Sequence, residues 1–182
     1  ETEVGVSGRV MSHPFAEPRS TPDFPYPPTQ EHPITRHFDR ACKQLQLHSL
    51  KTPRAILPHA VNQRRGCEYS GFCGSYGCSS GAKGSARAAL LDRAVRTGRC
   101  TIIPHAKVYR LISNANGDVD AAEYYDKAGQ KQRQEARLFV VACQAIETTR
   151  LLLSSTGTQH PKGLGNAHDQ VGKNLLFSAG GS

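Results

Sequence analysis

The stretch Gly66–Ser85, GCEYSGFCGSYGCSSGAKGS, is the part of the chain around which the rest is organised. It holds six glycines and three of the six cysteines, namely Cys67, Cys73 and Cys78. Glycine lacks a Cβ and tolerates positive φ, so such a loop can bring backbone N–H groups close to a bound group. A helix is predicted to begin at Ser85, and the N-terminal end of a helix suits anions. The stretch therefore predicts a ligand-facing loop that leads into a helix.

The spacing Cys-x5-Cys-x4-Cys leaves three interpretations of these thiols open. They can be ordinary loop residues, or they can hold an iron–sulfur cluster whose sulfurs accept hydrogen bonds from the loop. They can also bind zinc, but a structural zinc ion takes four ligands and the sequence shows no obvious fourth one. Cys42 differs from them, because it lies on the apolar stripe of a predicted helix and is expected to be a buried structural thiol.

The composition allows one domain with a real core, since the chain has 182 residues. The net charge of +8 comes from basic residues scattered over the whole chain, without the interleaved aromatic residues that stack on bases. We therefore expect no nucleic-acid surface.

The chain has neither an apolar run of about 20 residues nor a signal peptide. It does not begin with Met, so we interpret it as processed or as a fragment, and its compartment, periplasmic or cytoplasmic, stays open.

Two resemblances to phosphate-binding motifs do not hold. Residues 77–85 resemble a P-loop, but Ala82 separates Gly81 from Lys83, whereas that motif needs Gly-Lys adjacent. Residues 163–165 begin like a dinucleotide-binding fingerprint but follow no predicted strand. A kinase or NTPase function is therefore not predicted.

The first half of the chain predicts little regular structure outside two helices. Residues 1–33 carry seven of the eleven prolines, which favours an extended segment. A helix is expected over residues 34–47, with Ile34, Phe38, Cys42 and Leu45 on its apolar side. A second helix is expected over residues 85–97, capped by Ser85 and stopped by Gly98.

The second half predicts strands followed by a helix. A short strand is expected at residues 100–103, and three further runs at 107–113, 119–126 and 133–141 are joined by residues with turn chemistry, which indicates an antiparallel meander. Residues 138–143 are continuously apolar, as in a strand buried on both faces. A helix over 145–155 follows. This order predicts an α/β fold similar to the later part of a doubly wound sheet.

Three stretches carry a resemblance to a known family: 71–85, 139–153 (FVVACQAIETTRLLL) and 163–175 (GLGN followed by QVGKNL). Their residues, order and spacing resemble those of the glucose–methanol–choline (GMC) flavoprotein oxidoreductases. The branch with the large subunits of gluconate and fructose dehydrogenases is the most similar. The resemblance covers about residues 60–182.

The resemblance implies a fold, a cofactor and a reaction. It assigns residues 59–182 to an incomplete FAD-binding, Rossmann-like domain with an antiparallel β-meander, preceded by a Pro-rich segment and one helix over 1–58. It implies FAD and the oxidation of an alcohol group of a sugar, polyol or aldonate, with hydride passing to flavin N5. Electrons would leave to a partner subunit such as a cytochrome c. The positions implied to contact the cofactor are Val108 at the adenine, Ala142 and Cys143 near the ADP half, and Gly81 and Ala82 in the loop.

This chain departs from the family pattern in its cysteine spacing, at one glycine position and in two missing motifs. Some relatives carry a 3Fe–4S cluster on a Cys-x5-Cys-x3-Cys loop, and the loop here is one residue longer, so Cys67, Cys73 and Cys78 are the implied ligands of such a cluster. The family's glycine in A-x-G-A falls on Gln144 or on Cys143, depending on the register. The G-x-G-x-x-G motif and the catalytic histidine pair have no match here, so we expect the middle portion of such an enzyme. The alternative is a non-catalytic module that binds iron–sulfur or zinc.

Overall fold

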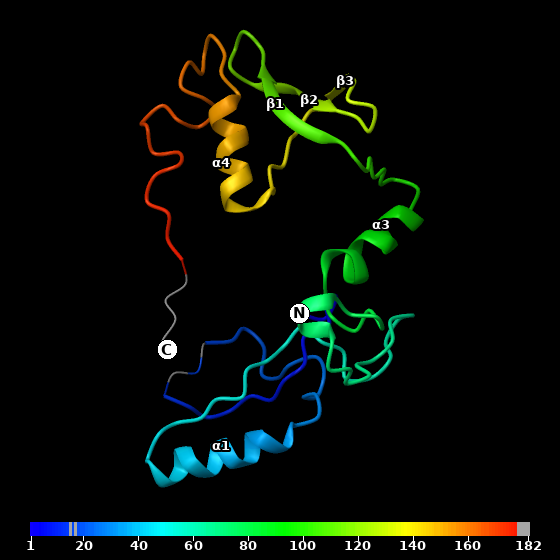
Figure 1. Cartoon of the computed structure of the whole chain (residues 1–182), viewed down its shortest axis with the longest axis vertical. Coiled ribbons are helices and arrows are strands. Elements are labelled where there is room, and N and C mark those ends of the chain that lie inside the picture. Colours follow the sequence, from blue (N-terminus) through cyan, green and yellow to red (C-terminus); the bar gives the residue numbers. More distant parts are fainter. Residues whose placement is uncertain (15, 17, 178–182) are drawn as a thin grey trace. The chain divides into compact units, whose positions relative to one another are not determined.

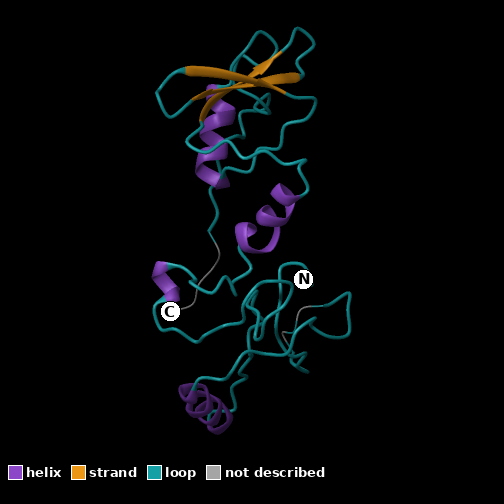
Figure 2. Cartoon of the chain, turned by 90° about the vertical axis from the view of Figure 1, so that its right-hand side faces the viewer, coloured by secondary structure: helices purple, strands orange, loops and turns teal. Residues whose placement is uncertain are grey.

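In the computed structural model, which describes residues 1–14, 16 and 18–177, the chain divides into two units, Glu1–Ile102 and Ile103–Ser182. Helices and long loops make up the first unit, and the strands of the sheet lie in the second (Figure 2). The predicted boundary between residues 58 and 59 falls inside the first unit. None of the helices in the described residues is long and apolar enough to cross a membrane.

Helix α1 (Pro33–Gln44) confirms the first predicted helix (Figure 1). Proline at its first position needs no hydrogen-bond partner for its nitrogen, and Nδ1 of His32 accepts the Ile34 N–H at 3.3 Å. Cys42 is buried, as predicted. The rest of the apolar stripe is 63% to 68% exposed at Ile34, Phe38 and Leu45. The stripe thus forms as predicted but is covered only at Cys42.

The second predicted helix forms in two parts. Its first part, Arg87–Leu91, is π-helical, and α3 (Asp92–Arg96) continues from it. Ser85 is the predicted cap: its Oγ accepts the N–H of Ala88 at 3.2 Å. Gly98, with φ of +71°, follows the last turn as expected. A short helix that the sequence pattern did not reveal, α2 (Cys73–Tyr76), lies within the Gly/Cys loop.

The two ends of the Gly/Cys loop are fixed on one buried residue, Leu57, which is 1% exposed. The Leu57 N–H donates to the carbonyl of Ala82 at 3.1 Å, and its own carbonyl accepts the N–H of Cys67 at 2.9 Å. The loop therefore leaves and returns on either side of Leu57.

One guanidinium group connects three segments of the first unit. Nη1 of Arg64 donates to the Val4 carbonyl at 3.0 Å and Nη2 to the Ala82 carbonyl at 3.1 Å, while Nε donates to the Gly81 carbonyl at 3.3 Å. A planar group with rigidly placed donors suits this role, because it bonds several acceptors at once. Arg64 thereby holds the N-terminal segment against the end of the Gly/Cys loop.

Arg64 is presented by a tight turn, Val61–Arg64, that the sequence pattern did not reveal. Two backbone hydrogen bonds of 2.9 Å close it, and its central residues Asn62 and Gln63 have φ of +48° and +67°. Positive φ at both central positions defines a type I′ turn, in which Asn is common but Gln is not. The unusual Gln is the reason that sequence rules miss it.

The second unit contains the predicted meander. Strands β1 (Lys107–Ser113), β2 (Val119–Tyr125) and β3 (Lys131–Glu135) pair antiparallel in chain order. Each turn is closed by the side chain of its first residue: Oδ1 of Asn114 and Oδ1 of Asp126 each accept two backbone N–H groups. Such Asx contacts explain why the turn residues were readable from the sequence.

Helix α4 (Gln144–Ser154) packs on this sheet around Leu111, Leu151 and Leu164. The buried hydroxyl of Ser155 ties the two elements together. It accepts the Leu111 N–H at 2.9 Å and donates to the Leu151 carbonyl at 2.6 Å. An unpaired polar group would be costly at this depth, so the hydroxyl fixes where the helix ends on β1.

The predicted strand over residues 138–143 is wrong for this structure. Phe139 and Val141 pack against the core, but Leu138 and Val140 are 79% and 83% exposed. That alternation belongs to an extended segment with one covered face. The segment joins neither the sheet nor a bridge among the described residues, and backbone groups need such partners to form a strand.

Two further strand predictions need the same correction. Residues 100–103 form no strand, since they too have no ladder partner in the described chain, and the third run is confined to β3, whose five residues are all exposed. The described residues combine helices with an antiparallel three-stranded sheet, which agrees with an α/β class. The Rossmann-like part of the prediction stays a prediction.

We expect the Arg64→Ala substitution to loosen the Gly/Cys loop, because three carbonyls lose a charged donor. Local opening should become easier by about 3 kcal/mol, and hydrogen exchange at the N–H groups of Leu57 and Gly84 should accelerate roughly a hundredfold. The neighbouring Arg65 is the control: its side chain is 70% exposed and pairs with Glu68, so Arg65→Ala should cost less than about 1 kcal/mol. Equal effects of the two substitutions would contradict the role given to Arg64.

Candidate functional site

An open hollow of about 740 Å³ lies at the N-terminal end of α4. Its walls come from residues 141, 142, 144, 145, 148 and 149 and from residues 173–176 of the segment that follows α4. Small side chains, Ala142 and Ala145, leave the helix end accessible, and Leu175 and Leu176 add an apolar wall. Lys173 supplies a cation. The hollow thus combines a helix N-terminus, a positive charge and apolar surface.

Gln144 has a left-handed backbone conformation, which glycine adopts more readily than other residues. Its φ is +62°, whereas Cys143 has φ of −89°. Of the two registers, the positive φ favours Gln144 as the counterpart of the family's glycine, which stays a prediction. The Gln144 side chain also caps α4, because its Oε1 accepts the Ile146 N–H at 3.0 Å.

Three residues of the second unit are predicted cofactor contacts, and they lie in different surroundings. Ala142 lines the hollow, and the exposed Cys143 follows it directly before α4, where its side chain makes no capping hydrogen bond. Val108 lies on β1, packs against the core and does not line the hollow. Its carbonyl accepts a long contact of 3.5 Å from Arg150 of α4. Their roles as cofactor contacts stay predictions.

The two predicted loop positions, Gly81 and Ala82, have opposite surroundings. Gly81 has φ of +71°, and a Cβ built there would meet no atom within 4 Å, so its α-carbon faces open space. Ala82 is fully buried. Its carbonyl already accepts from Leu57 and Arg64, as described above, and its N–H donates to Oγ of Ser80 at 3.4 Å. Ala82 thus holds the loop, whereas Gly81 leaves room for close approach.

The thiols of the Gly/Cys loop are all free, and each has its own local partner. The contacts are 3.4 Å from the Tyr69 N–H to Sγ of Cys67, 3.4 Å from Sγ of Cys73 to the Ser70 carbonyl, and 3.5 Å between Cys78 and the Ser80 hydroxyl. In the part of the chain that the structure describes, no three His, Cys, Asp or Glu side chains are grouped as metal ligands. The structure therefore does not support the predicted cluster ligands.

Cys78 is nevertheless chemically distinct. Its pKa is lowered from the ordinary 9.0 to about 7, first by the Ser80 hydroxyl and then by backbone N–H groups of the turn at Gly81, Ala82 and Lys83, against a smaller opposing effect of burial. Donors that point at a sulfur stabilise its thiolate form. A substantial fraction of the Cys78 side chain is therefore thiolate at neutral pH.

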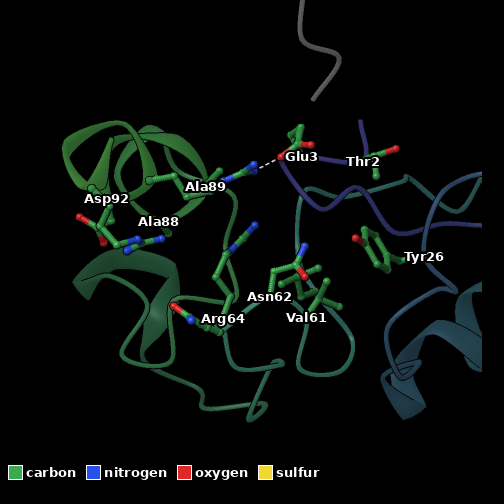
Figure 3. A pocket seen from close by; sticks show the side chains of 13 residues that line it. Thr2, Glu3, Tyr26, Val61, Asn62, Arg64, Ala88, Ala89 and Asp92 are labelled. Atoms are coloured by element: carbon green, nitrogen blue, oxygen red, sulfur yellow. Dashed lines mark hydrogen bonds and ion pairs between the residues drawn. The ribbon is translucent and has the colours of Figure 1, made fainter. Parts of the chain in front are cut away.

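A smaller cavity of about 140 Å³ lies beside Arg64 in the first unit (Figure 3). Figure 3 shows Arg64 between the turn at Val61 and Asn62 and the helical residues Ala88 and Ala89. Across the cavity, the Arg93 guanidinium forms an ion pair with Glu3. Since Arg64 bonds backbone carbonyls and Arg93 is paired, we assign this cavity a structural role.

Comparison with known proteins gives the family. Residues 27–178 match the family model described as GMC oxidoreductase. The chain belongs to the GMC oxidoreductase family. The predicted family is therefore confirmed, and GMC oxidoreductases bind FAD.

Three curated relatives show which GMC oxidoreductases this chain is similar to. It is 38% identical to paromamine 6′-oxidase of Streptomyces fradiae, over 69% of this chain and 24% of the relative. It is 33% identical to 6‴-hydroxyparomomycin C oxidase of Streptomyces lividus, over 83% and 28%. It is 38% identical to the fructose dehydrogenase large subunit of Gluconobacter japonicus, over 43% and 14%. The chain thus spans no more than 28% of the length of these relatives.

We predict that glycine is tolerated at position 144 and a β-branched residue is not. Gln144→Gly removes the strain of positive φ but also the side-chain cap, so the unfolding free energy should change by less than about 0.5 kcal/mol. Gln144→Val adds strain and removes the cap, and should cost about 2 kcal/mol. Chemical denaturation of both variants measures this. An equal loss in the two would show that residue 144 is not held in the left-handed conformation.

We predict that Cys78 is alkylated by iodoacetamide with a midpoint near pH 7. Because Ser80 is the largest cause of the lowered pKa, Ser80→Ala should move the midpoint upward, and the exposed neighbour Ser79→Ala should not. Since the folded pKa lies below the unfolded value, the associated stability is present above pH 9 and is lost as the pH falls through about 7. Peptide mapping by mass spectrometry gives the midpoint, and a Ser80→Ala profile identical to that of the unsubstituted protein would contradict the assignment.

Proposed function

We propose that this chain is part of a FAD-dependent dehydrogenase or oxidase that oxidises an alcohol group of a sugar, polyol or aldonate. Family membership is the observation that carries the proposal. The relatives support the substrate class, since one is named for fructose and another for paromamine.

The hollow at α4 supports a role in holding the ADP half of FAD. An adenine ring needs an apolar wall, which Leu175 and Leu176 offer, and a diphosphate needs N–H groups and cations, which the α4 N-terminus and Lys173 offer. The small side chain of Ala142 allows close approach. These residues fit the group, and Cys143 adjoins it.

FAD would supply the hydride acceptor, its N5 atom. The residues of this chain bind and orient, because none of its histidines matches the position of the family's catalytic pair. On this proposal Gly81 and Val108 are further cofactor contacts, and proton transfer belongs to residues outside this chain. A relative named as a large subunit supports an electron-accepting partner subunit, such as a cytochrome c.

The test uses the full-length protein that contains this chain. Denaturation should release FAD, and anaerobic addition of a panel of sugars, polyols and aldonates should bleach the bound flavin with at least one of them. Ala142→Phe should fill the hollow and lower FAD affinity about tenfold. The matched control, Ala128→Phe, alters an exposed turn and should leave the affinity unchanged. Absence of FAD, or a flavin that no alcohol reduces, would overturn the proposal.

A further inference from the structure

A groove of about 480 Å³ lies in the first unit between α1 and two extended segments. We call it the α1 groove; its walls come from residues 7–9, 28–32, 35, 38, 39, 49–52 and 54. Its volume is in the range of small-molecule sites. None of its residues lines the hollow at α4 or contacts the loop thiols, so it is a separate candidate site.

The groove wall is held in place by backbone pairing. Ser7 and Arg54 exchange two backbone hydrogen bonds of 2.8 and 2.9 Å, and Ser7 is 2% exposed. The side chain of Arg54 therefore starts from a fixed position on the wall. On the facing side, the first turns of α1 are held by the Pro33 start and the His32 cap.

Neutral hydrogen-bonding side chains dominate the lining. They are hydroxyl, amide and imidazole groups, from Thr29, Gln30, His32, Thr35, Ser49 and Thr52. Such groups both donate and accept, as the hydroxyls of a polyol do. The ring of Phe38, which is 63% exposed, adds an apolar surface for the C–H side of such a ligand.

The carboxylates that line the groove have an oppositely charged partner, whereas its arginines have none among the described residues. Both of its carboxylates are paired with one lysine: Lys51 contacts Glu31, and its Nζ lies 3.4 Å from Asp39. The two lining arginines, Arg9 and Arg54, have no carboxylate partner among the residues that the structure describes. Two guanidinium groups without a carboxylate partner in the described chain favour a carboxylate ligand, to which a guanidinium can donate two parallel hydrogen bonds.

The geometry points to the α1 groove as a binding site for a small polyhydroxylated carboxylate. The carboxylate lies at Arg9 and Arg54, the hydroxyls bond the neutral side chains, and the carbon chain packs on Phe38. This site is additional to the proposed cofactor hollow. It requires no turnover, so its test does not depend on alcohol oxidation.

The experiment is calorimetric titration of the full-length protein with gluconate and with sorbitol, which has the same carbon chain but no carboxylate. Gluconate should bind more tightly. Arg9→Gln and Arg54→Gln should each weaken gluconate binding about fivefold and the double variant more than tenfold, without effect on sorbitol. Phe38→Ala should weaken both ligands. The control, Ile34→Ala, removes an equally exposed apolar residue of α1 that does not line the groove and should change neither.

The outcomes separate this inference from the proposed function. Gluconate affinity that is unchanged in the double arginine variant overturns the inference, even where gluconate bleaches the flavin, because binding then occurs elsewhere. No saturable gluconate binding also overturns it. A flavin that no alcohol reduces, together with arginine-dependent gluconate binding, overturns the proposed function and leaves the groove assigned. Circular dichroism of each variant confirms that the fold is retained.

Discussion

The three hydrogen bonds of the Arg64 guanidinium are the constraint on which the first unit depends. This unit has no sheet of its own among the described residues, and its regular elements are short apart from α1. Its segments are joined by isolated backbone pairings, for example at Leu57, Ser7 and Arg54, by ion pairs such as Lys51 with Glu31, and by this side chain. The glycine-rich Gly/Cys loop is therefore presented from fixed ends, as a loop that faces a ligand requires.

In the second unit, apolar contacts and one hydroxyl group fix the position of the C-terminal end of α4. Leu111, Leu151 and Leu164 supply apolar contact, which is not directional. The hydroxyl of Ser155 adds the directional part by joining β1 to the last turn of α4. The opposite end of α4 is left open at the hollow. One end of this helix is thus buried in the core, and the other borders the hollow.

Local chemistry explains which elements were predictable. The meander, α1 and α4 follow from side-chain periodicity and from turn residues whose own side chains close the turns, such as Asn114 and Asp126. Residues 138–143 were mispredicted as a strand because a continuous apolar run indicates burial but does not show whether a neighbouring strand pairs with it. The turn that presents Arg64 was missed because Gln63 is an uncommon residue at positive φ. Family motifs located Ala142, yet only the coordinates placed it at a hollow.

The sequence by itself determined the family, the meander and the extent of the Gly/Cys loop, because motifs, periodicity and turn chemistry are properties of neighbouring residues. Tertiary structure alone decided the partners of Arg64, the positive φ of Gln144, and the separation of the three thiols. It also decided that Arg9 and Arg54, 45 positions apart in the sequence, share one groove. Each of these depends on where distant segments meet, and that is set by packing and hydrogen bonds between segments.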